Sequence, residues 1–457
     1  MKNILQKNNF FFVGIAGTGM SAIAQYLRGL GKNISGSDRI FVNENKLPIQ
    51  NGLEDIGITC FFQDGSGISS QTEVLVVSTA IENTNPEVKK ALELNLPIIK
   101  RSELLAAISD EKYTIAIGGT SGKSTTTAMI FHILQTLNLS PSLITGAGLT
   151  SLQKNGLPGN AYVGESEYLV IEADESDGSI VGYKPQISVL LNIDRDHKEL
   201  DELITLFETY KTNTKNIFIV NNNQKETKEL KQSNLYTFGT DTDSGFRGAN
   251  FTQKDFAISF TCNDCNVNVP SIGKHNMENA LAAIAASHAL GIAIESSAKA
   301  LSSFEGIYRR TQLVGKFNDI TVIDDFAHNP AEIRAALQAC QIFSKRVFAW
   351  FQPHGFGPLK FMQDELVEYI SQTLRINDVF YMSDVYYAGG TVDKTINSDI
   401  IIEALKIKGS QVYYIKDKYE LSVHLKENLM PGDTILLMGA RDPFLNEFAI
   451  DLFNKIQ

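Results

Sequence analysis

The sequence lacks long apolar runs and is poor in cysteine. No stretch of about 18 consecutive apolar residues occurs in its 457 residues, which argues against a membrane-spanning helix. The start, Met1–Lys7, has neither a long apolar segment nor a small-residue cleavage site, so we expect no secretory signal peptide. Four cysteines do not suggest a disulfide framework in a chain of this length. Together these features favour a reduced, cytoplasmic setting.

Positive charge is also scarce. Lysine and arginine number 41 against 52 aspartates and glutamates, which gives a net charge of −11. This balance argues against broad nucleic-acid binding. It does not exclude small anionic nucleotides, because glycine loops and a few local cations bind those. Apolar residues make up 43% of the chain, enough for several cores, and the length predicts two to four domains.

The strongest motif is the stretch TIAIGGTSGKSTTTAMIFHILQTL, residues 114–137. It predicts a buried strand, a turn of small residues at 118–122, and a helix that opens at Lys123. In such a turn glycines let backbone N–H groups approach a phosphate, and the helix N-terminus and the lysine add positive charge. The Ser124 hydroxyl can ligate Mg²⁺. The loop is a variant, since Ile117 stands where the usual pattern has glycine.

We therefore predict nucleotide binding at this loop; the alternative is a tight strand-to-helix turn with a solvated lysine. The residues expected to contact the nucleotide are Gly119, Thr120, Ser121, Gly122, Lys123, Ser124 and Thr125.

Acidic residues follow two apolar segments of the same region. The strand predicted at 168–172 runs into Glu172–Asp177, and that at 187–193 runs into Asp194–His197. The carboxyl ends of parallel strands lie at the sheet edge from which the phosphate loop also leaves. Mg²⁺ ligation is therefore predicted there. The alternatives are solvated acidic loops and, for His197, a loop hydrogen bond.

The pattern at residues 10–38 predicts the first βαβ unit of a Rossmann-like domain. A strand at 10–13 leads through a glycine turn, 14–20, into a helix, and a second strand ends at Asp38. The glycine spacing is G-x-x-G-x-G, so NAD, FAD and other nucleotide-bearing ligands stay open at this point. A further strand at 73–78 leads into Thr79.

The last third, from residue 319, returns to α/β. Four predicted strands there each deliver polar residues at their carboxyl ends, which is typical of a second ligand-binding sheet. Before it, Asn276 and Asn279 open an alanine-rich helix, as caps or as readers of a base edge. The pair Arg309–Arg310 suits phosphate charge. We predict linkers at 109–112 and 315–318.

Ten segments in order resemble motifs of the Mur ligase family of ATP-dependent amide ligases. They are FVGIAGTGMSAIA, GGTSGKSTTT, IEADESD, Asp196–His197, GKHNMENALAA, GIYRR, DDFAHNP, QPH, SDVY and MGARD. The resemblance implies three α/β domains: a Rossmann-like UDP-sugar domain at 1–108, a central P-loop ATPase at 109–314 and a Rossmann-like C-terminal domain at 315–457. It implies that ATP phosphorylates the carboxylate of UDP-N-acetylmuramate and that L-alanine attacks the acyl phosphate, in peptidoglycan synthesis.

The resemblance also implies roles for individual residues. Lys123 would hold the β- and γ-phosphates and Ser124 one Mg²⁺, with Glu172 and His197 on a second. Asn276 and Asn279 would contact adenine, Asp325 the ribose, and Arg309 or Arg310 the transferring phosphate. His328 and His354 would face the acyl phosphate or the incoming amine. The implied catalytic set is Lys123, His197, Arg310, His328 and His354. The implied UDP-sugar set is Gly14, Gly17, Thr18, Gly19, Met20, Ser37, Asp38, Ser78 and Thr79. Lys211 is a position for a carbamylated lysine, with a surface lysine as the favoured alternative.

Departures from the family pattern keep the acceptor open. Gly355 and Pro358 stand where arginines are usual, Asn329 replaces a second histidine, and Tyr308 replaces a glycine. The alternatives are therefore L-alanine, a peptide or another amine as the acceptor, or a different UDP-sugar. A regulator that has lost catalysis is a further alternative. We expect small-molecule partners, no nucleic acid, no membrane insertion, and a monomer or weak dimer.

Overall fold

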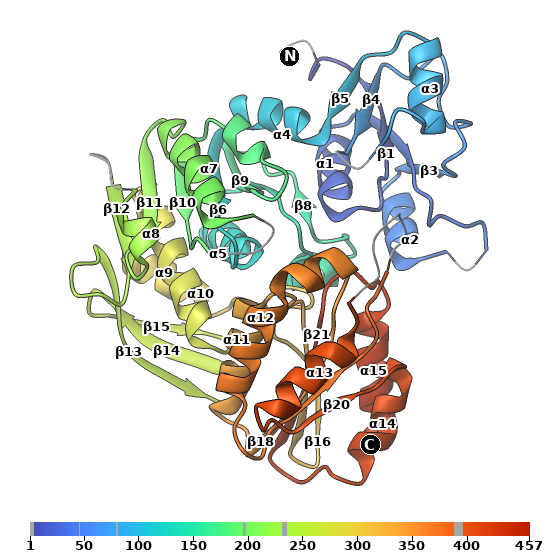
Figure 1. The fold of residues 1–457 in the computed structure, drawn as a ribbon. Coiled ribbons are helices and arrows are strands. Elements are labelled where there is room, and N and C mark those ends of the chain that lie inside the picture. Colours follow the sequence, from blue (N-terminus) through green and yellow to red (C-terminus); the bar gives the residue numbers. More distant parts are fainter. Residues whose placement is uncertain (1–3, 45, 79–80, 195–197, 231–234, 388–395) are drawn as a thin grey trace. The chain divides into compact units, whose positions relative to one another are not determined.

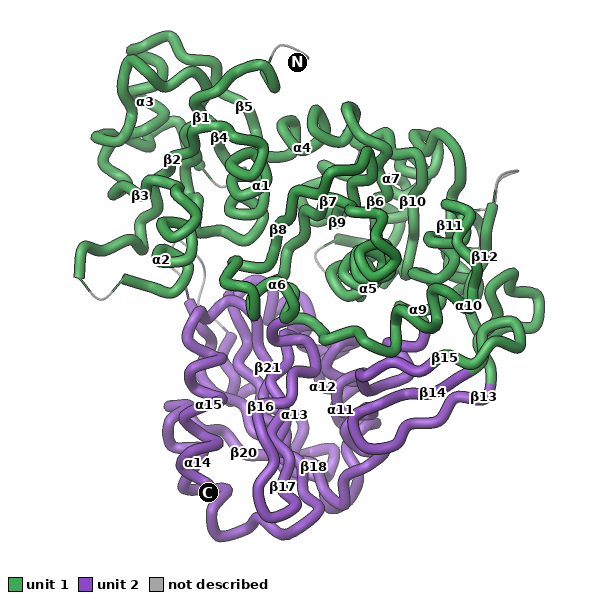
Figure 2. The backbone as a smooth tube through the Cα atoms, turned by 180° about the vertical axis from the view of Figure 1, so that it is seen from behind, with its two compact units in different colours: residues 1–249, 261–267, 278–307 green, residues 250–260, 268–277, 308–457 purple. Residues whose placement is uncertain are grey.

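The computed structural model is α/β throughout (Figure 1) and describes residues 4–457 except 45, 79–80, 195–197, 231–234 and 388–395. The described chain divides into two compact units (Figure 2). Unit 1 comprises residues 1–249, 261–267 and 278–307, and unit 2 comprises 250–260, 268–277 and 308–457. The predicted domain limits at 108 and 314 stay predictions.

The N-terminal sheet is parallel, with strand order β3-β2-β1-β4-β5. Its strands are β1 (Asn9–Val13), β2 (Asn33–Ser37), β3 (Thr59–Phe61), β4 (Val74–Val77) and β5 (Ile98–Lys100). Its helices are α1 (Thr18–Gly29), α2 (Pro48–Asp55), α3 (Pro86–Glu93) and α4 (Arg101–Asp110). The apolar run at 10–13 is buried, as its sequence predicts. The predicted linker at 109–112 is partly wrong, because α4 continues to Asp110.

The second sheet has ten strands in the order β15-β14-β13-β12-β11-β10-β6-β9-β7-β8. Its strands are β6 (Tyr113–Gly118), β7 (Ser142–Ile144), β8 (Ala161–Tyr162), β9 (Tyr168–Glu172), β10 (Ile187–Leu190), β11 (Ile217–Asn221), β12 (Leu235–Gly239), β13 (Phe246–Lys254), β14 (Ala257–Cys262) and β15 (Cys265–Val269). Its helices are α5 (Lys123–Thr136), α6 (Thr150–Lys154), α7 (Leu200–Thr212), α8 (Lys225–Lys228), α9 (Lys274–His288) and α10 (Ile294–Leu301), with a 3₁₀ turn at Ser179–Gly182. Both β9 and β10 pair with β6 in parallel, so their carboxyl ends share one edge with the phosphate loop, as predicted.

The C-terminal sheet has the order β16-β17-β21-β18-β19-β20. Its strands are β16 (Gln312–Phe317), β17 (Ile320–Asp325), β18 (Arg346–Gln352), β19 (Val379–Met382), β20 (Val412–Tyr414) and β21 (Asp433–Gly439). Its helices are α11 (Pro330–Gln341), α12 (Phe356–Thr373), α13 (Ser398–Ile407), α14 (Leu421–Lys426) and α15 (Leu445–Ile456), with a 3₁₀ turn at Lys418–Glu420. The predicted linker at 315–318 is wrong. Residues 315–317 belong to β16, which pairs antiparallel with β17 through a turn at Asn318–Asp319.

Within unit 1, one hydrophobic core joins the N-terminal and central sheets. Ile23 and Leu27 of α1 belong to the same buried cluster as Ile144 of β7 and Ala161 of β8. The helix that follows the first glycine turn is therefore packed against the domain that carries the phosphate loop. None of the helices in the described part of the chain has the length and apolarity that crossing a membrane requires.

Candidate active site

The phosphate loop joins β6 to α5 and is shaped by two glycines with positive φ. Gly119 has φ +134° and Gly122 has φ +85°. A Cβ added at Gly122 would lie 2.5 Å from Oδ1 of Asn279, so the site tolerates no side chain. Asn279, one of the two predicted adenine contacts, is therefore packed directly against the loop.

Asn192, two residues after β10, stabilises the phosphate loop through three hydrogen bonds. Its Oδ1 accepts hydrogen bonds from the Thr120 hydroxyl and the Ser121 backbone N–H, each 2.8 Å long. Its Nδ2 donates to the Ser121 carbonyl at 2.9 Å. This residue was not predicted, because its function follows only from the pairing of β10 with β6.

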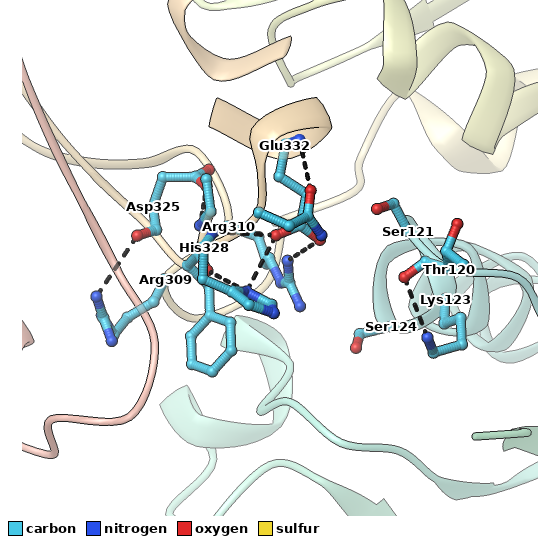
Figure 3. Close-up of polar contacts among 12 residues, drawn as sticks. Thr120, Ser121, Lys123, Ser124, Arg309, Arg310, Asp325, His328 and Glu332 are labelled. Atoms are coloured by element: carbon cyan, nitrogen blue, oxygen red, sulfur yellow. Dashed lines mark hydrogen bonds and ion pairs between the residues drawn. The ribbon is translucent and has the colours of Figure 1, made fainter. Parts of the chain in front are cut away.

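The ammonium group of Lys123 lies among three oxygen acceptors. Nζ is 2.9 Å from Glu175 Oε2, and it donates to the carbonyls of Gly119 at 2.7 Å and Thr120 at 3.2 Å. Burial alone would lower the pKa of Lys123, but the charges of Glu175, Glu172 and Asp174 hold it above its ordinary value. Lys123 is thus a fixed cation inside the loop (Figure 3).

Two predicted metal ligands, Ser124 and Glu172, are in contact. The Ser124 hydroxyl donates to Glu172 Oε2 at 2.9 Å, and the same oxygen accepts from the Thr145 hydroxyl and the Gly146 N–H. Hydroxyl and carboxylate oxygens are the donors that Mg²⁺ prefers, so this pair fits that ion. Among the described residues no three histidine, cysteine, aspartate or glutamate side chains are gathered around one point.

His197, the other predicted metal ligand, lies outside the described residues. Lys211, on the last turn of α7, forms an ion pair with Glu208 one turn earlier, at 2.5 Å. The Lys211 side chain is only 15% exposed, and its carbamylation stays a prediction. Thr125, in the first turn of α5, is half-buried beside the loop.

The first glycine turn connects β1 to α1 and is closed by the end of β2. The Gly14 N–H donates to the Ser37 carbonyl at 2.7 Å, and the Ala16 N–H donates to Asp38 Oδ2 at 3.0 Å. Burial raises the pKa of Asp38, against the backbone hydrogen bonds that lower it. Gly17 and Thr18 at the start of α1 are exposed, and Gly19 is half-buried.

The remaining residues of the predicted UDP-sugar set differ in exposure. The Met20 side chain is buried in the core. The Ser37 hydroxyl is also fully buried, and it has no hydrogen-bond partner among the described residues. Ser78 is half-buried just after β4, and Thr79 lies outside the described residues.

Two residues that were not predicted lie beside this turn. Arg101 of α4 approaches Gly19, where an added Cβ would be 2.9 Å from Nη1, and it pairs with Asp177 at 2.9 Å. Asn160 donates to the Thr18 carbonyl and to the Ser21 hydroxyl, each at 3.0 Å. Both contacts tie the first turn to the central part of unit 1.

In unit 2, the twin arginines have different environments. Arg309 is buried and makes a bidentate ion pair with Asp324 through Nε and Nη2, while Nη2 also donates to the Gly439 carbonyl. Arg310 is more exposed; it lies 4.9 Å over the Phe326 ring and 3.6 Å from Glu332. The guanidinium of Arg309 is therefore engaged within the fold, and Arg310 is the arginine that fits a phosphate contact.

Asp325, the predicted ribose contact, holds the loop after β17. Its Oδ2 accepts from the Thr311 N–H at 2.6 Å and its Oδ1 from the Ala327 N–H at 2.7 Å. Burial raises the pKa of Asp325 to about 6. Asn276 has a similar local function, since its Nδ2 donates to the Ile272 carbonyl and the Ser271 hydroxyl. Asn276 belongs to unit 2 and Asn279 to unit 1.

His328 and His354 lie side by side, with ring centroids 5.4 Å apart. His328 Nδ1 is 3.1 Å from Glu332 Oε2, which comes from the first turn of α11 (Figure 3). Glu332 was not predicted; it lies four residues after His328, in the first turn of the helix that follows the histidine. The structure thus brings Arg310, His328 and His354 together with an unforeseen carboxylate.

Three profiles of the Mur ligase family match successive parts of the chain. The sequence profile of the Mur ligase family, catalytic domain, matches residues 9–113, that of the Mur ligase middle domain matches 117–287, and that of the Mur ligase, glutamate ligase domain, matches 309–441. The UDP-N-acetylmuramate–L-alanine ligase of Dictyoglomus turgidum is 34% identical over 462 residues, covering 96% of this chain and 95% of its own. The ligase of the same name from Agathobacter rectalis is 35% identical, covering 97% of both chains.

Solved structures give the same fold. The UDP-N-acetylmuramate-alanine ligase of Thermotoga maritima superposes with a TM-score of 0.81 at 25% identity, over 98% of this chain and 100% of its own. A murein peptide ligase from Psychrobacter arcticus has a TM-score of 0.70 at 23% identity, over 98% of both chains. The three-domain α/β architecture predicted from the motifs is confirmed.

Proposed function

The chain belongs to the Mur ligase family, and on that premise we propose that it joins L-alanine to the carboxylate of UDP-N-acetylmuramate at the expense of ATP. Relatives matched over nearly their whole length carry this name, which supports the assignment. The reaction would supply peptidoglycan synthesis. We expect a cytoplasmic enzyme with small-molecule partners, as a monomer or weak dimer.

The reaction has two steps. A carboxylate oxygen of the sugar attacks the γ-phosphorus, the bond to the β-phosphate oxygen breaks, and ADP leaves an acyl phosphate behind. The amine nitrogen then attacks the acyl carbon, and the bond from that carbon to the phosphate oxygen breaks. The products are an amide, ADP and inorganic phosphate. Because carboxylate and triphosphate repel each other, the site must supply fixed positive charge.

The observation that carries the proposal is the phosphate loop with Lys123 at its centre. Its ammonium group lies within hydrogen-bond distance of two loop carbonyls, and its charge is maintained by neighbouring carboxylates. The loop amides at 119–122 and the N-terminus of α5 add further positive potential. We assign Lys123 to the β- and γ-phosphates, Asn279 and Asn276 to adenine, and Asp325 to the ribose.

Ser124 and Glu172 are the residues that would hold Mg²⁺, with His197 as a further ligand. When bound, the ion neutralises phosphate charge and orients the transferring group. We assign Arg310 to the transferring phosphate, since Arg309 is engaged by Asp324. His328 and His354 would face the acyl phosphate or the amine.

The first glycine turn would take the UDP-sugar. The exposed residues Gly17 and Thr18 lie at the N-terminus of α1, which favours an anion, and the buried Ser37 hydroxyl offers an additional polar group. The assigned set is Gly14, Gly17, Thr18, Gly19, Met20, Ser37, Asp38, Ser78 and Thr79.

The acceptor site has a local reason for departing from the family pattern. Gly355 precedes α12 with φ +73°, a conformation that strains any other residue, so no arginine fits there without a change of backbone. Pro358 lies in the first turn of that helix, where proline is tolerated. These residues leave open a larger acceptor than L-alanine.

The test is phosphate release from ATP and magnesium in the presence of UDP-N-acetylmuramate and a panel of amines that includes L-alanine and a murein tripeptide. We expect turnover that depends on both the sugar and L-alanine. UDP-N-acetylglucosamine, which lacks the carboxylate, is the matched control and should support none. Activity that peaks with the tripeptide would reassign the acceptor. No turnover with any combination would favour a nucleotide-binding regulator.

A further inference from the structure

The imidazole ring of His328 has two hydrogen-bond acceptors close to one of its nitrogens, Nδ1. Nδ1 lies 3.1 Å from the Phe326 carbonyl oxygen and 3.1 Å from Glu332 Oε2. Neither acceptor can donate a proton, so Nδ1 must carry one. In the neutral ring the lone pair is therefore on Nε2. The hydrogen bonds thus select one tautomer, and it is the one whose Nε2 accepts a proton.

Glu332 is held in place by the backbone of its own turn. Asn329 caps α11, with its Oδ1 accepting from the Glu332 N–H at 2.9 Å. In return, Glu332 Oε2 accepts from the His328 N–H at 3.2 Å. The capping segment therefore fixes both the carboxylate and the residue that carries the imidazole.

The charge of Glu332 is preserved although the side chain is largely buried. Burial alone would raise the pKa of Glu332, but the charge of His328, the hydrogen bonds from it and the charge of Arg310 hold it well below its usual range. Glu332 Oε1 lies 3.6 Å from Arg310 Nη1. One carboxylate thus orients both the imidazole and the arginine that we assign to the transferring phosphate.

We propose that His328 is the general base for the incoming amine and that Glu332 is the positioning residue that fixes its tautomer. The inference rests on the proposed function. The ammonium group gives one proton to Nε2 of His328, and the neutral nitrogen attacks the acyl carbon. A second proton leaves the nitrogen for the departing phosphate, and the imidazolium returns its proton to solvent. Glu332 stabilises that imidazolium while it exists.

The experiment compares two nucleophiles in the full-length protein with ATP, magnesium and UDP-N-acetylmuramate. L-Alanine is an ammonium ion at neutral pH and needs a base, whereas hydroxylamine is already neutral and yields a hydroxamate. H328N keeps an amide donor near the Nδ1 position but removes the base. We expect H328N to lower kcat with L-alanine roughly 100-fold, and E332Q roughly tenfold, with about the wild-type rate of hydroxamate formation in both.

The pH profile of the L-alanine reaction gives a second measurement. In the described part of the chain, titratable and charged groups around the His328–Glu332 pair include Arg310, Asp325 at the end of β17, His354 after β18, and His275 at the start of α9. All are unchanged in E332Q. Loss of the carboxylate disfavours the imidazolium, so the acidic limb of the kcat/KM profile should move to lower pH. E403Q, which removes an exposed carboxylate of α13 from an ion pair with Lys406, is the matched control and should leave the profile in place.

Three outcomes would overturn the inference. If H328N and E332Q lowered the rates with L-alanine and with hydroxylamine equally, His328 and Glu332 would act in the phosphoryl transfer or in the fold. Wild-type turnover of L-alanine by H328N would remove His328 as the base. An unshifted acidic limb in E332Q would remove Glu332 as its positioning residue. A wild-type protein that forms neither amide nor hydroxamate would instead overturn the proposed function, and the inference with it.

Discussion

Unit 1 contains two loops of the same construction, each a strand, a glycine turn and a helix. The first joins β1 to α1 and the second joins β6 to α5. Each has a glycine in the left-handed region, Gly14 with φ +77° and Gly122 with φ +85°. Each is also accompanied by a buried carboxylate, Asp38 or Glu175. The backbone alone therefore does not distinguish the ligands of the two loops.

The difference lies in what the carboxylates bind. Asp38 accepts a backbone N–H of its own turn, whereas Glu175 is paired with Lys123 inside the second loop. The first turn contains no lysine or arginine, and Arg101 approaches it from α4. A cation built into the loop suits a triphosphate, while a turn with one adjacent arginine suits a less charged diphosphate.

One acidic segment, Glu172–Asp177, contacts the second loop directly and is paired with Arg101 of α4, which lies beside the first. Glu172 accepts from Ser124, Glu175 pairs with Lys123, and Asp177 pairs with Arg101. The segment begins at the last residue of β9, which pairs with β6, so the sheet register brings Glu172 beside the second loop. The two loops are thus separate in chemistry but share a source of counter-charge.

The largest predicted effect is that of Lys123→Ala. Removing the built-in cation should lower phosphate release by roughly 10³-fold or more, because the transferring charge loses a fixed partner. UDP-N-acetylmuramate binding, measured by calorimetry, should persist, since we assign the sugar to the first loop. Lys215→Ala, which removes a surface lysine 4.0 Å from Asp110, is the control and should change neither. Loss of sugar binding in K123A would contradict the separation of the loops.

Arg101→Ala should weaken UDP-sugar binding and leave the use of ATP unchanged, the reverse of Lys123→Ala. We expect roughly tenfold weaker UDP-sugar binding, the size of one lost charge-assisted hydrogen bond, with the KM for ATP unchanged. Asp177→Asn removes the counter-charge and keeps the arginine, so sugar binding should stay within about twofold of wild type. If R101A weakened ATP binding as much as sugar binding, the two loops would not be independent.

The strands and the phosphate loop were predictable because their signals are local. Apolar runs such as Tyr168–Glu172 and Val379–Met382 match observed strands residue for residue. The strand β16 was missed because its sequence, QLVGKF, is short and interrupted by polar residues and glycine. An edge strand of this kind is stabilised by pairing with β17, which no local pattern reveals.

The candidate site was predictable only where a motif names the residue. Lys123, Ser124 and Glu172 are part of such motifs. The choice between Arg309 and Arg310 was not, because adjacent residues have equal chemistry and only the fold buries one of them against Asp324. Asn192 and Glu332 were missed because their function depends on a partner, a loop amide or an imidazole, that the sequence does not mark.

Glycine-to-alanine substitutions compare the space in the two loops. Gly14→Ala should cost about 1 to 2 kcal/mol of unfolding free energy, from strain alone, since the nearest atom to its Cβ is Ile81 Cδ1 at 4.0 Å. Gly122→Ala adds the contact with Asn279 at 2.5 Å, so about 3 kcal/mol and weaker ATP binding are expected. Urea denaturation measures the first quantity and calorimetry the second.

The control for strain is Gly31→Ala, at φ +83° with no atom within 4 Å. It should resemble G14A. The double variant G122A/N279A should recover part of the lost unfolding free energy, because the clashing amide of Asn279 is gone. Equal costs for G14A and G122A would show that the second loop is no tighter than the first.

The smallest effect concerns the pH dependence of the first loop. Burial raises the pKa of Asp38 above 3.8, so the folded protein holds this proton more tightly than the unfolded chain. The resulting stabilisation is complete at pH values below the pKa of Asp38 in the unfolded chain. It is lost as the pH rises through the higher pKa of Asp38 in the folded protein. The unfolding free energy of D38N relative to wild type should therefore increase as the pH rises above 3.8 and through the raised pKa. Asp64 is the control with the opposite sign, because hydrogen bonds from Ser66 lower its pKa. Asp64 therefore stabilises the fold fully only above its unfolded pKa, so the unfolding free energy of D64N relative to wild type should fall as the pH rises toward 3.8 and change little above that value. The measurement is urea denaturation at a series of pH values. If the unfolding free energy of D38N relative to wild type fell with rising pH, as expected for D64N, burial would not raise the pKa of Asp38.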